Sequence, residues 1–237
     1  DAITSVLGLA YDRQSQRLYA ATGPVPQSPV TQGGDAPGPA LVAFDPHTGE
    51  ITARHTIEGA ESFGDVVSAE GVIYASDPDS ARVYQLGEDG LKVFADDSRF
   101  ASPQGLAAAK DALWLADYAL GLWRIDLRDG TVSLVDAGPE SLIGLDGLVA
   151  DQAGALYAVR NGSQPSTVLK LTPGEGAKVT AEPVLRGHRL MEEATQIRYG
   201  DGRLFLLANA GWSYFPEAAS GETPDPPRPA VLSFEAD

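Results

Sequence analysis

The chain of 237 residues contains no cysteine, only three histidines and a single methionine. Without cysteine it can form no disulfide, no thiolate metal site and no cysteine nucleophile. Basic residues are also scarce, because 17 Lys and Arg stand against 33 Asp and Glu, a formal net charge of −16. Nucleic acids and anionic membrane surfaces bind proteins through basic patches. This acidic balance therefore argues against both as partners.

Long apolar runs are missing as well. No stretch approaches the ~18 consecutive apolar residues of a membrane-spanning helix, although 43% of the residues are hydrophobic. The chain opens on Asp1 without a charged-then-apolar leader, which indicates either a leader that was removed or a trimmed chain. We expect a periplasmic or secreted protein with a single domain over residues 1–237.

What the sequence does contain is a repeat. In each copy a short apolar strand, usually after Gly, leads through a turn to a second strand that carries an aromatic residue. The copies read GLAYDRQSQRLYAAT, GDVVSAEGVIYASD, GLAAAKDALWLADY, GLVADQAGALYAVRNG and QIRYGDGRLFLLAN. The aromatic residues are Tyr19, Tyr74, Trp114, Tyr157 and Phe205. Their spacing of roughly 40–55 residues is typical of β-propeller blades.

A third strand with alternating apolar and polar residues follows in every repeat, and a fourth closes all repeats but the last. The third strands are ALVAFDP, RVYQLGE, GLWRIDL, TVLKLTP and AVLSFEA. The fourth strands are ITARHTI, LKVFADD, TVSLVDA and EPVLRG. Two Pro-rich segments, 23–39 and 213–229, are predicted to be irregular loops. The fold class is therefore an all-β propeller of four-stranded blades, five of them visible.

Two arrangements stay open for the ring. It has five blades, or it is a six-bladed type that lacks or borrows part of one blade. In the second case we expect the chain to pair with another segment, with a protein partner or with itself.

A ligand site in a propeller draws residues from the starts of the innermost strands, which open on one face. These positions hold Leu7, Asp65, Gln104, Asp146 and Glu193. Converging carboxylates with an amide suit a hard cation such as Ca²⁺ or Mg²⁺. The alternative is that the side chains cap turns by accepting backbone N–H groups.

Other polar residues should reach the same face. His188, just before the fifth inner strand, is a candidate general base or ligand. Asn161 and Asn209 follow the second strands of their repeats at matching positions, where they contact a ligand or cap a loop. Trp212 lies after Asn209 as a stacking residue or a core residue. No nucleophile motif and no phosphate-binding loop is present.

Several of these segments are similar to those of a known family. Four stretches resemble the senescence-marker-protein/gluconolactonase-like propellers and, more distantly, the strictosidine-synthase-like group. They are Ser102-Pro-Gln-Gly-Leu, Ala116-Asp-Tyr-Ala-Leu-Gly-Leu-Trp-Arg-Ile-Asp, Gly144-Leu-Asp-Gly-Leu and Arg160-Asn-Gly-Ser-Gln-Pro-Ser-Thr-Val. The resemblance covers nearly the whole chain. It implies a six-bladed, commonly exported propeller with a divalent metal at the channel mouth, and the activity of a lactonase or related hydrolase.

The resemblance also implies a metal ligand set of Glu, Asn and Asp. Asp146 matches the Asp, the Asn position reads Gln104, and the Glu position reads Leu7, which removes one charged ligand. Asp65 stands as a replacement carboxylate.

Two functions follow from these residues. One is a metal-dependent hydrolase of lactones or esters, with Ca²⁺ held by Asp146, Asp65 and Gln104. In it Glu193 or His188 is the base, and the residues expected to contact the substrate are Asn161, Asn209, Trp212 and Glu192. The other is a non-catalytic propeller that binds a small molecule or a protein partner.

Overall fold

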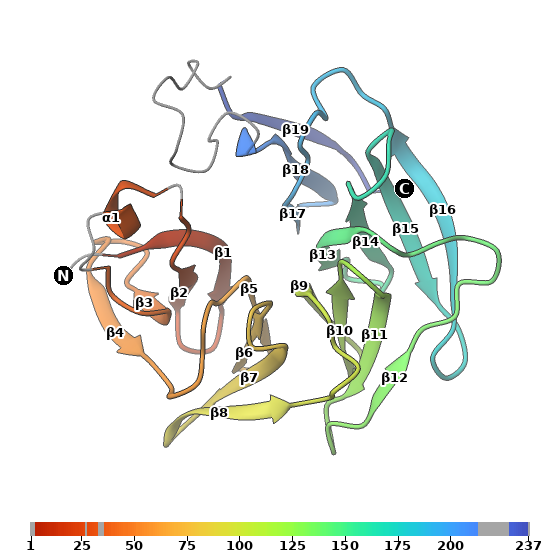
Figure 1. Ribbon diagram of the computed structural model, residues 1–237. Helices are drawn as coiled ribbons and strands as arrows, with labels where there is room; N and C mark the ends of the chain where they lie inside the picture. Colours follow the sequence, from red (N-terminus) through yellow and green to blue (C-terminus); the bar gives the residue numbers. More distant parts are fainter. Residues whose placement is uncertain (1–2, 27, 33–35, 213–227, 237) are drawn as a thin grey trace. The chain divides into compact units, whose positions relative to one another are not determined.

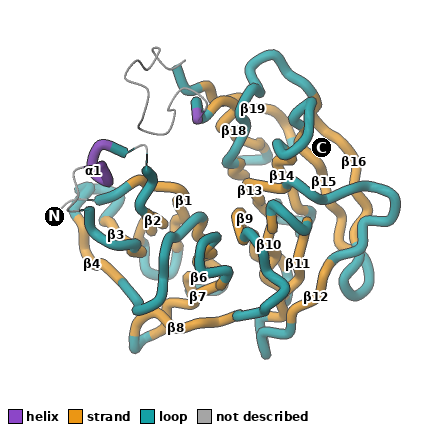
Figure 2. The backbone as a smooth tube through the Cα atoms, in the orientation of Figure 1, coloured by secondary structure: helices purple, strands orange, loops and turns teal. Residues whose placement is uncertain are grey.

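The structure is a computed structural model that describes residues 3–26, 28–32, 36–212 and 228–236. The chain divides into two compact units, residues 1–104 and 105–237. Strands and the loops between them make up almost all of the described chain, and helix is limited to very short segments (Figure 2). Over the described residues, no helix has the length and apolar character needed to cross a membrane.

The first unit holds two antiparallel four-stranded sheets (Figure 1). The first sheet has the order β1-β2-β3-β4, with β1 Ser5–Asp12, β2 Arg17–Gly23, β3 Ala40–Phe44 and β4 Ile51–His55. The second has the order β5-β6-β7-β8, with β5 Asp65–Ala69, β6 Val72–Asp77, β7 Arg82–Gly87 and β8 Gly90–Ala95. A four-residue helix, α1 (Pro29–Gln32), lies in the connection between β2 and β3, where the sequence predicts only irregular loop.

Three further sheets follow along the chain (Figure 1). The third contains β9 Pro103–Ala109, β10 Ala112–Asp117, β11 Gly121–Asp126 and β12 Val132–Leu134; the boundary between the two units falls within β9. The fourth contains β13 Leu145–Ala150, β14 Leu156–Arg160, β15 Thr167–Pro173 and β16 Val179–Arg186. The last has three strands, β17 Ile197–Gly200, β18 Arg203–Asn209 and β19 Ala230–Glu235.

Each sheet is a meander of neighbouring strands, which is the blade of a β-propeller, so the predicted fold class is confirmed. The last blade has no fourth strand among the described residues, as its sequence indicates. Most of the predicted loop 213–229 lies outside the described residues. The hairpin turn between β5 and β6 places both central residues at positive φ, 51° for Glu70 and 82° for Gly71, and Gly adopts this conformation without strain.

Glycines at the innermost strands explain why each repeat so often begins with Gly. A Cβ on Gly105 of β9 would overlap the carbonyl oxygen of Asp146, and one on Gly147 of β13 would overlap that of Thr195. In the first unit, a Cβ on Gly8 would overlap Asp65. Neighbouring inner strands therefore approach more closely than any side chain allows.

The repeated aromatic residue fills the space between neighbouring blades. Trp114 is 3% exposed and packs with Leu148 of the next blade, and Tyr157 is 1% exposed and packs with Ile197. Phe205 is the exception at 42% exposed, and it belongs to the last blade along the chain. The repeated aromatic position is therefore buried in the first four blades and exposed in the last.

Candidate functional site

In four of the five blades the second strand ends in a polar residue or is directly followed by one. These residues are Asp77, Asp117, Asn161 and Asn209. Three of these side chains cap the loop that comes next. The carboxylate of Asp77 accepts four backbone N–H groups at 2.9 to 3.3 Å. That of Asp117 accepts two at 3.1 and 3.2 Å, and Asn209 Oδ1 accepts the N–H of Gly211 at 3.0 Å. Capping is therefore the ordinary use of this position.

Asn161 departs from that use. Its Nδ2 donates to Asp146 Oδ2 at 2.8 Å and to the carbonyl oxygen of Ala194 at 2.7 Å. Because both partners are acceptors, they fix which end of the amide is nitrogen. The Oδ1 atom is buried and has no hydrogen-bond partner among the described residues. A buried acceptor without a donor is costly, which points to a ligand or water that donates to it.

Four of the predicted site residues come together in the second unit. Asp146, the second residue of β13, is half-buried and is held by Asn161. Glu193 forms a parallel bridge with Asn209, and its carbonyl accepts the N–H of Ala210 at 3.0 Å. The carbonyl that fixes Asn161 belongs to Ala194, the residue after Glu193, so the two pairs are joined through the backbone of residues 193 and 194.

Tyr118 lies beside this network and is not among the candidate site residues identified from the sequence. Its side chain is partly exposed, at 39%. Burial of the ring raises the pKa of Tyr118, and the nearby negative charge of Asp146 raises it further. A Cβ on Gly162, the residue after Asn161, would lie 3.2 Å from Tyr118 Cζ, so the ring covers this turn. The sequence feature that could have identified Tyr118 is its position directly after the capping residue Asp117.

Three other predicted residues lie outside this network of contacts. His188 is half-buried in a turn, where its Nδ1 accepts the N–H of Leu190 at 3.3 Å and its carbonyl accepts that of Met191 at 2.8 Å. Glu192 is exposed, and Trp212 is 44% exposed. Their proposed contacts with a substrate stay predictions.

The remaining predicted metal ligands lie in the first unit. Asp65, fully buried at the start of β5, donates its backbone N–H to Ser76 Oγ at 3.0 Å. Ser76 Oγ donates in turn to the carbonyl oxygen of Gln104 at 2.5 Å. The amide of Gln104 donates to Ser102 Oγ at 3.0 Å. Leu7, where the resemblance expects Glu, is half-buried in β1.

The predicted metal set therefore falls on both units, with Asp65 and Gln104 in one and Asp146 in the other. Over the described part of the chain, no group of three or more His, Asp or Glu side chains is placed to hold a metal ion. Within the second unit the donors suit a hard cation in kind, since Asp146 offers a carboxylate and Asn161 an amide oxygen without a partner.

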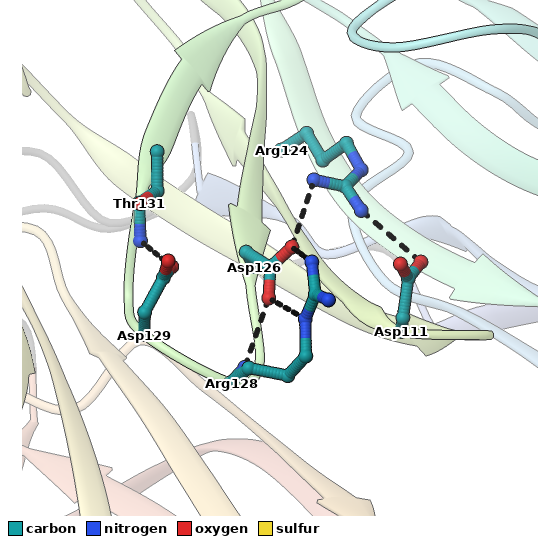
Figure 3. Close-up of polar contacts among 6 residues, drawn as sticks. All are labelled: Asp111, Arg124, Asp126, Arg128, Asp129 and Thr131. Carbon is teal, nitrogen blue, oxygen red and sulfur yellow. Dashed lines mark hydrogen bonds and ion pairs between the residues drawn. The ribbon is translucent and has the colours of Figure 1, made fainter.

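A separate cluster of charges surrounds Asp126 (Figure 3). It includes Asp111, the residue before β10, whereas Asp117 ends that strand. Asp126 accepts three hydrogen bonds from Arg128, at 2.8 to 3.0 Å, and is 3.6 Å from Arg124. Arg124 also donates to Asp111 at 3.1 Å. Hydrogen bonds from the side chain and backbone of Arg128 hold the pKa of Asp126 far below its ordinary value. Because every charge here has a partner, this cluster stabilises the β11–β12 turn.

No family model matches the sequence, and no curated protein matches it. Solved structures do. A gluconolactonase-like protein is 15% identical over 89% of this chain and 74% of its own, with a TM-score of 0.65. Virginiamycin B lyase from Staphylococcus aureus is 15% identical over 86% of this chain, with a TM-score of 0.63. A 6-phosphogluconolactonase-like protein from Bacteroides uniformis is 15% identical over 88% of this chain and 65% of its own, with a TM-score of 0.60.

The structural neighbours are thus gluconolactonase-like and virginiamycin B lyase propellers, and the likeness in fold predicted from the sequence is confirmed. At these identities the likeness concerns the fold alone. The chain spans 63% of the length of virginiamycin B lyase and of a streptogramin B lyase.

Proposed function

We propose that the chain is a propeller hydrolase that opens a lactone or another ester at the network of Asp146, Asn161 and Glu193. The observation that carries the proposal is the side chain of Asn161. Where the same position in other blades caps a loop, Asn161 is turned to a carboxylate and keeps a buried acceptor without a donor. The fold shared with gluconolactonase-like and lyase propellers supports a reaction of this class.

The chemistry follows from what two neighbouring acceptors bind. A water molecule that donates one proton to Asn161 Oδ1 and the other to the carboxylate of Asp146 has its lone pairs directed away from both. Such a water is oriented to attack an ester carbonyl, and Asp146 takes its proton as the general base. The proton that Asp146 has taken then passes to the departing alkoxide, directly or through Glu193, which leaves both carboxylates ionised for the next turnover.

A divalent cation is the second part of the proposal. Asp146 and the amide oxygen of Asn161 would hold it, and Ca²⁺ is the expected ion because both donors are hard oxygens. Bound there, it would polarise the ester carbonyl or acidify a water. Loss of activity on treatment with a chelator, restored by Ca²⁺, supports this part; unchanged activity in the metal-free protein removes it and leaves the hydrolase proposal standing.

The activity test is a panel of lactones of several ring sizes together with aryl esters. Asp146→Asn keeps the shape of the side chain but removes the base, so we expect kcat/KM to fall by about 10²- to 10⁴-fold. Asn161→Ala should lower it without changing the fold. Asp77→Asn is the matched control, because it alters the loop cap at the same position of a blade in the first unit and leaves Asn161 and Asp146 in place.

Three results would contradict the proposal. One is turnover that is the same in Asp146→Asn as in the parent protein. The second is an equal loss of activity in Asn161→Ala and in the control Asp77→Asn. The third is binding of panel compounds without turnover, which would instead identify a non-catalytic binding propeller.

A further inference from the structure

The first unit contains a hollow that the proposed hydrolase does not use. Its volume is about 540 Å³, within the range of small-molecule sites. The lining residues are Tyr11, Asp12, Arg13, Gln14, Ser68, Glu70 and Gly71. They come from the ends of β1 and β5 and from the turns that follow, whereas Asp65 lies at the start of β5. Within this unit, the hollow and the predicted ligand Asp65 are thus at opposite ends of the same strand.

The floor of the hollow is fixed before any ligand arrives. Asp12 is 2% exposed, and its carboxylate accepts the N–H of Ser15 and the hydroxyl of Ser68, both at 2.7 Å. The second bond joins β1 to β5 of the next blade. The amide of Gln14 lies against Gly71, where a Cβ would overlap it. Neighbouring hairpins are therefore locked together, and a preformed site costs less free energy to occupy.

The rim carries two opposite charges that do not neutralise each other. Arg13 and Glu70 are both exposed and both line the hollow. In the described residues neither takes part in an ion pair, although Arg17, four positions on, pairs with Asp45 at 3.3 Å. A guanidinium and a carboxylate on one rim offer partners to a ligand that carries both charges.

An aromatic surface completes the site. Tyr11 is 48% exposed although it is large and lies within a strand. An exposed aromatic ring that lines a hollow contributes apolar contact area at a low cost in conformational entropy. It would pack against the side chain of a ligand whose charged groups meet Arg13 and Glu70.

We propose that this hollow binds a zwitterionic α-amino acid, with its carboxylate on Arg13, its ammonium on Glu70 and an aromatic or aliphatic side chain against Tyr11. The site is independent of the ester hydrolase proposed above.

The test is a titration of the isotope-labelled protein with phenylalanine, followed by amide chemical shifts. We expect shifts at Tyr11, Gln14, Ser68 and Gly71, with a Kd on the order of 1 mM. N-acetylphenylalanine lacks the ammonium and phenylalaninamide lacks the carboxylate. Each should bind about three- to tenfold more weakly, as partly exposed charge pairs contribute little more than that.

Two substitutions separate the contacts. Glu70→Gln should weaken phenylalanine about three- to tenfold and leave N-acetylphenylalanine unchanged, and Arg13→Gln should weaken phenylalanine and leave phenylalaninamide unchanged. Glu88→Gln and Arg189→Gln are matched controls, because both residues are exposed and neither lines the hollow. The proposal is overturned if phenylalanine at about ten times that Kd causes no shifts at the hollow. It is also overturned if both analogues bind as tightly as phenylalanine.

Discussion

Substitution by alanine at three of the four matching positions after the second strands, Asp77, Asn161 and Asn209, tests whether Asn161 serves a ligand or the fold. Asp77 is fully buried, and its carboxylate accepts the backbone N–H groups of Glu61, Ser62, Asp79 and Ser80. Asp77→Ala leaves these four donors without their acceptor.

The size of the loss follows from the contacts. A single hydrogen bond to a charged acceptor contributes about 1.5–3 kcal/mol net to stability. The four are not additive, because three share Asp77 Oδ1 and water reaches the exposed Glu61 and Asp79. We expect Asp77→Ala to lower the free energy of unfolding by about 3–4 kcal/mol.

Asn161→Ala should behave differently. It removes a hydrogen bond to the charged Asp146, which contributes about 1.5–3 kcal/mol, and one to the Ala194 carbonyl, which contributes about 1 kcal/mol. It also removes a buried oxygen without a partner, which costs about 1–3 kcal/mol, so the net loss of unfolding free energy is about 1–2 kcal/mol. Asn209→Ala, which loses one capping bond, should cost about 1 kcal/mol.

Urea unfolding of the three variants, followed by tryptophan fluorescence, measures these differences. If Asn161→Ala is destabilised as strongly as Asp77→Ala, then Asn161 is a structural residue and the argument for a ligand at its Oδ1 is wrong. A small loss of stability together with a large loss of ester hydrolysis would support the argument.

Three further predictions concern titration and packing. Tyr118 should titrate above its ordinary pKa of 10.0, and Asp146→Asn should lower that pKa while the contribution of burial remains; NMR of ring-labelled tyrosine measures both. Asp97 has a pKa of about 2, because the side chain and N–H of Arg99 bond its carboxylate, against an ordinary value of 3.8. The ionised Asp97 therefore contributes its full stabilisation above pH 3.8, and this contribution is lost as the pH falls through about 2. The unfolding free energy of Asp97→Asn should lack that part of the dependence on acid pH. Gly147→Ala should lower the unfolding free energy by about 2–4 kcal/mol, measured in urea, because a Cβ there overlaps the Thr195 carbonyl; an unchanged midpoint would mean that the inner strands can separate.

Most of the fold was predictable from the sequence because the repeat is an alternation of apolar and polar residues with Gly-rich turns. Strand boundaries follow the alternation closely, as in β11, where GLWRIDL is predicted and GLWRID is observed. Helix α1 was missed, because four residues within a Pro- and Gly-rich loop carry no periodic signal. The exposure of Phe205 was also not predictable, since the pattern shows which face a residue occupies and not what covers that face.

The candidate site was predictable only in part. The matching positions of Asn161 and Asn209 were visible in the sequence, but the two alternatives considered there, contact with a ligand and capping of a loop, were both open. The structure separates them, because Asn209 caps Gly211 while Asn161 bonds Asp146. Tyr118 was missed because the residue after a loop cap is ordinarily part of the loop. The predicted metal ion, substrate contacts and exported location stay predictions.

The glycine of each repeat also shows how this fold can change its chemistry without losing its core. In the second unit, the backbones of β9, β13 and β17 approach closely at Gly105 and Gly147, and the N–H of Gly147 bonds the carbonyl of Thr195 at 3.2 Å. The residue just before the glycine, Gln104 or Asp146, is not needed for that approach. A substitution there therefore alters the polar group presented at the start of an inner strand, while the crowded strands stay in register. On this argument, Asp146→Asn should lower kcat/KM of the proposed hydrolysis by about 10²- to 10⁴-fold with little loss of stability, whereas Gly147→Ala should lower both activity and stability.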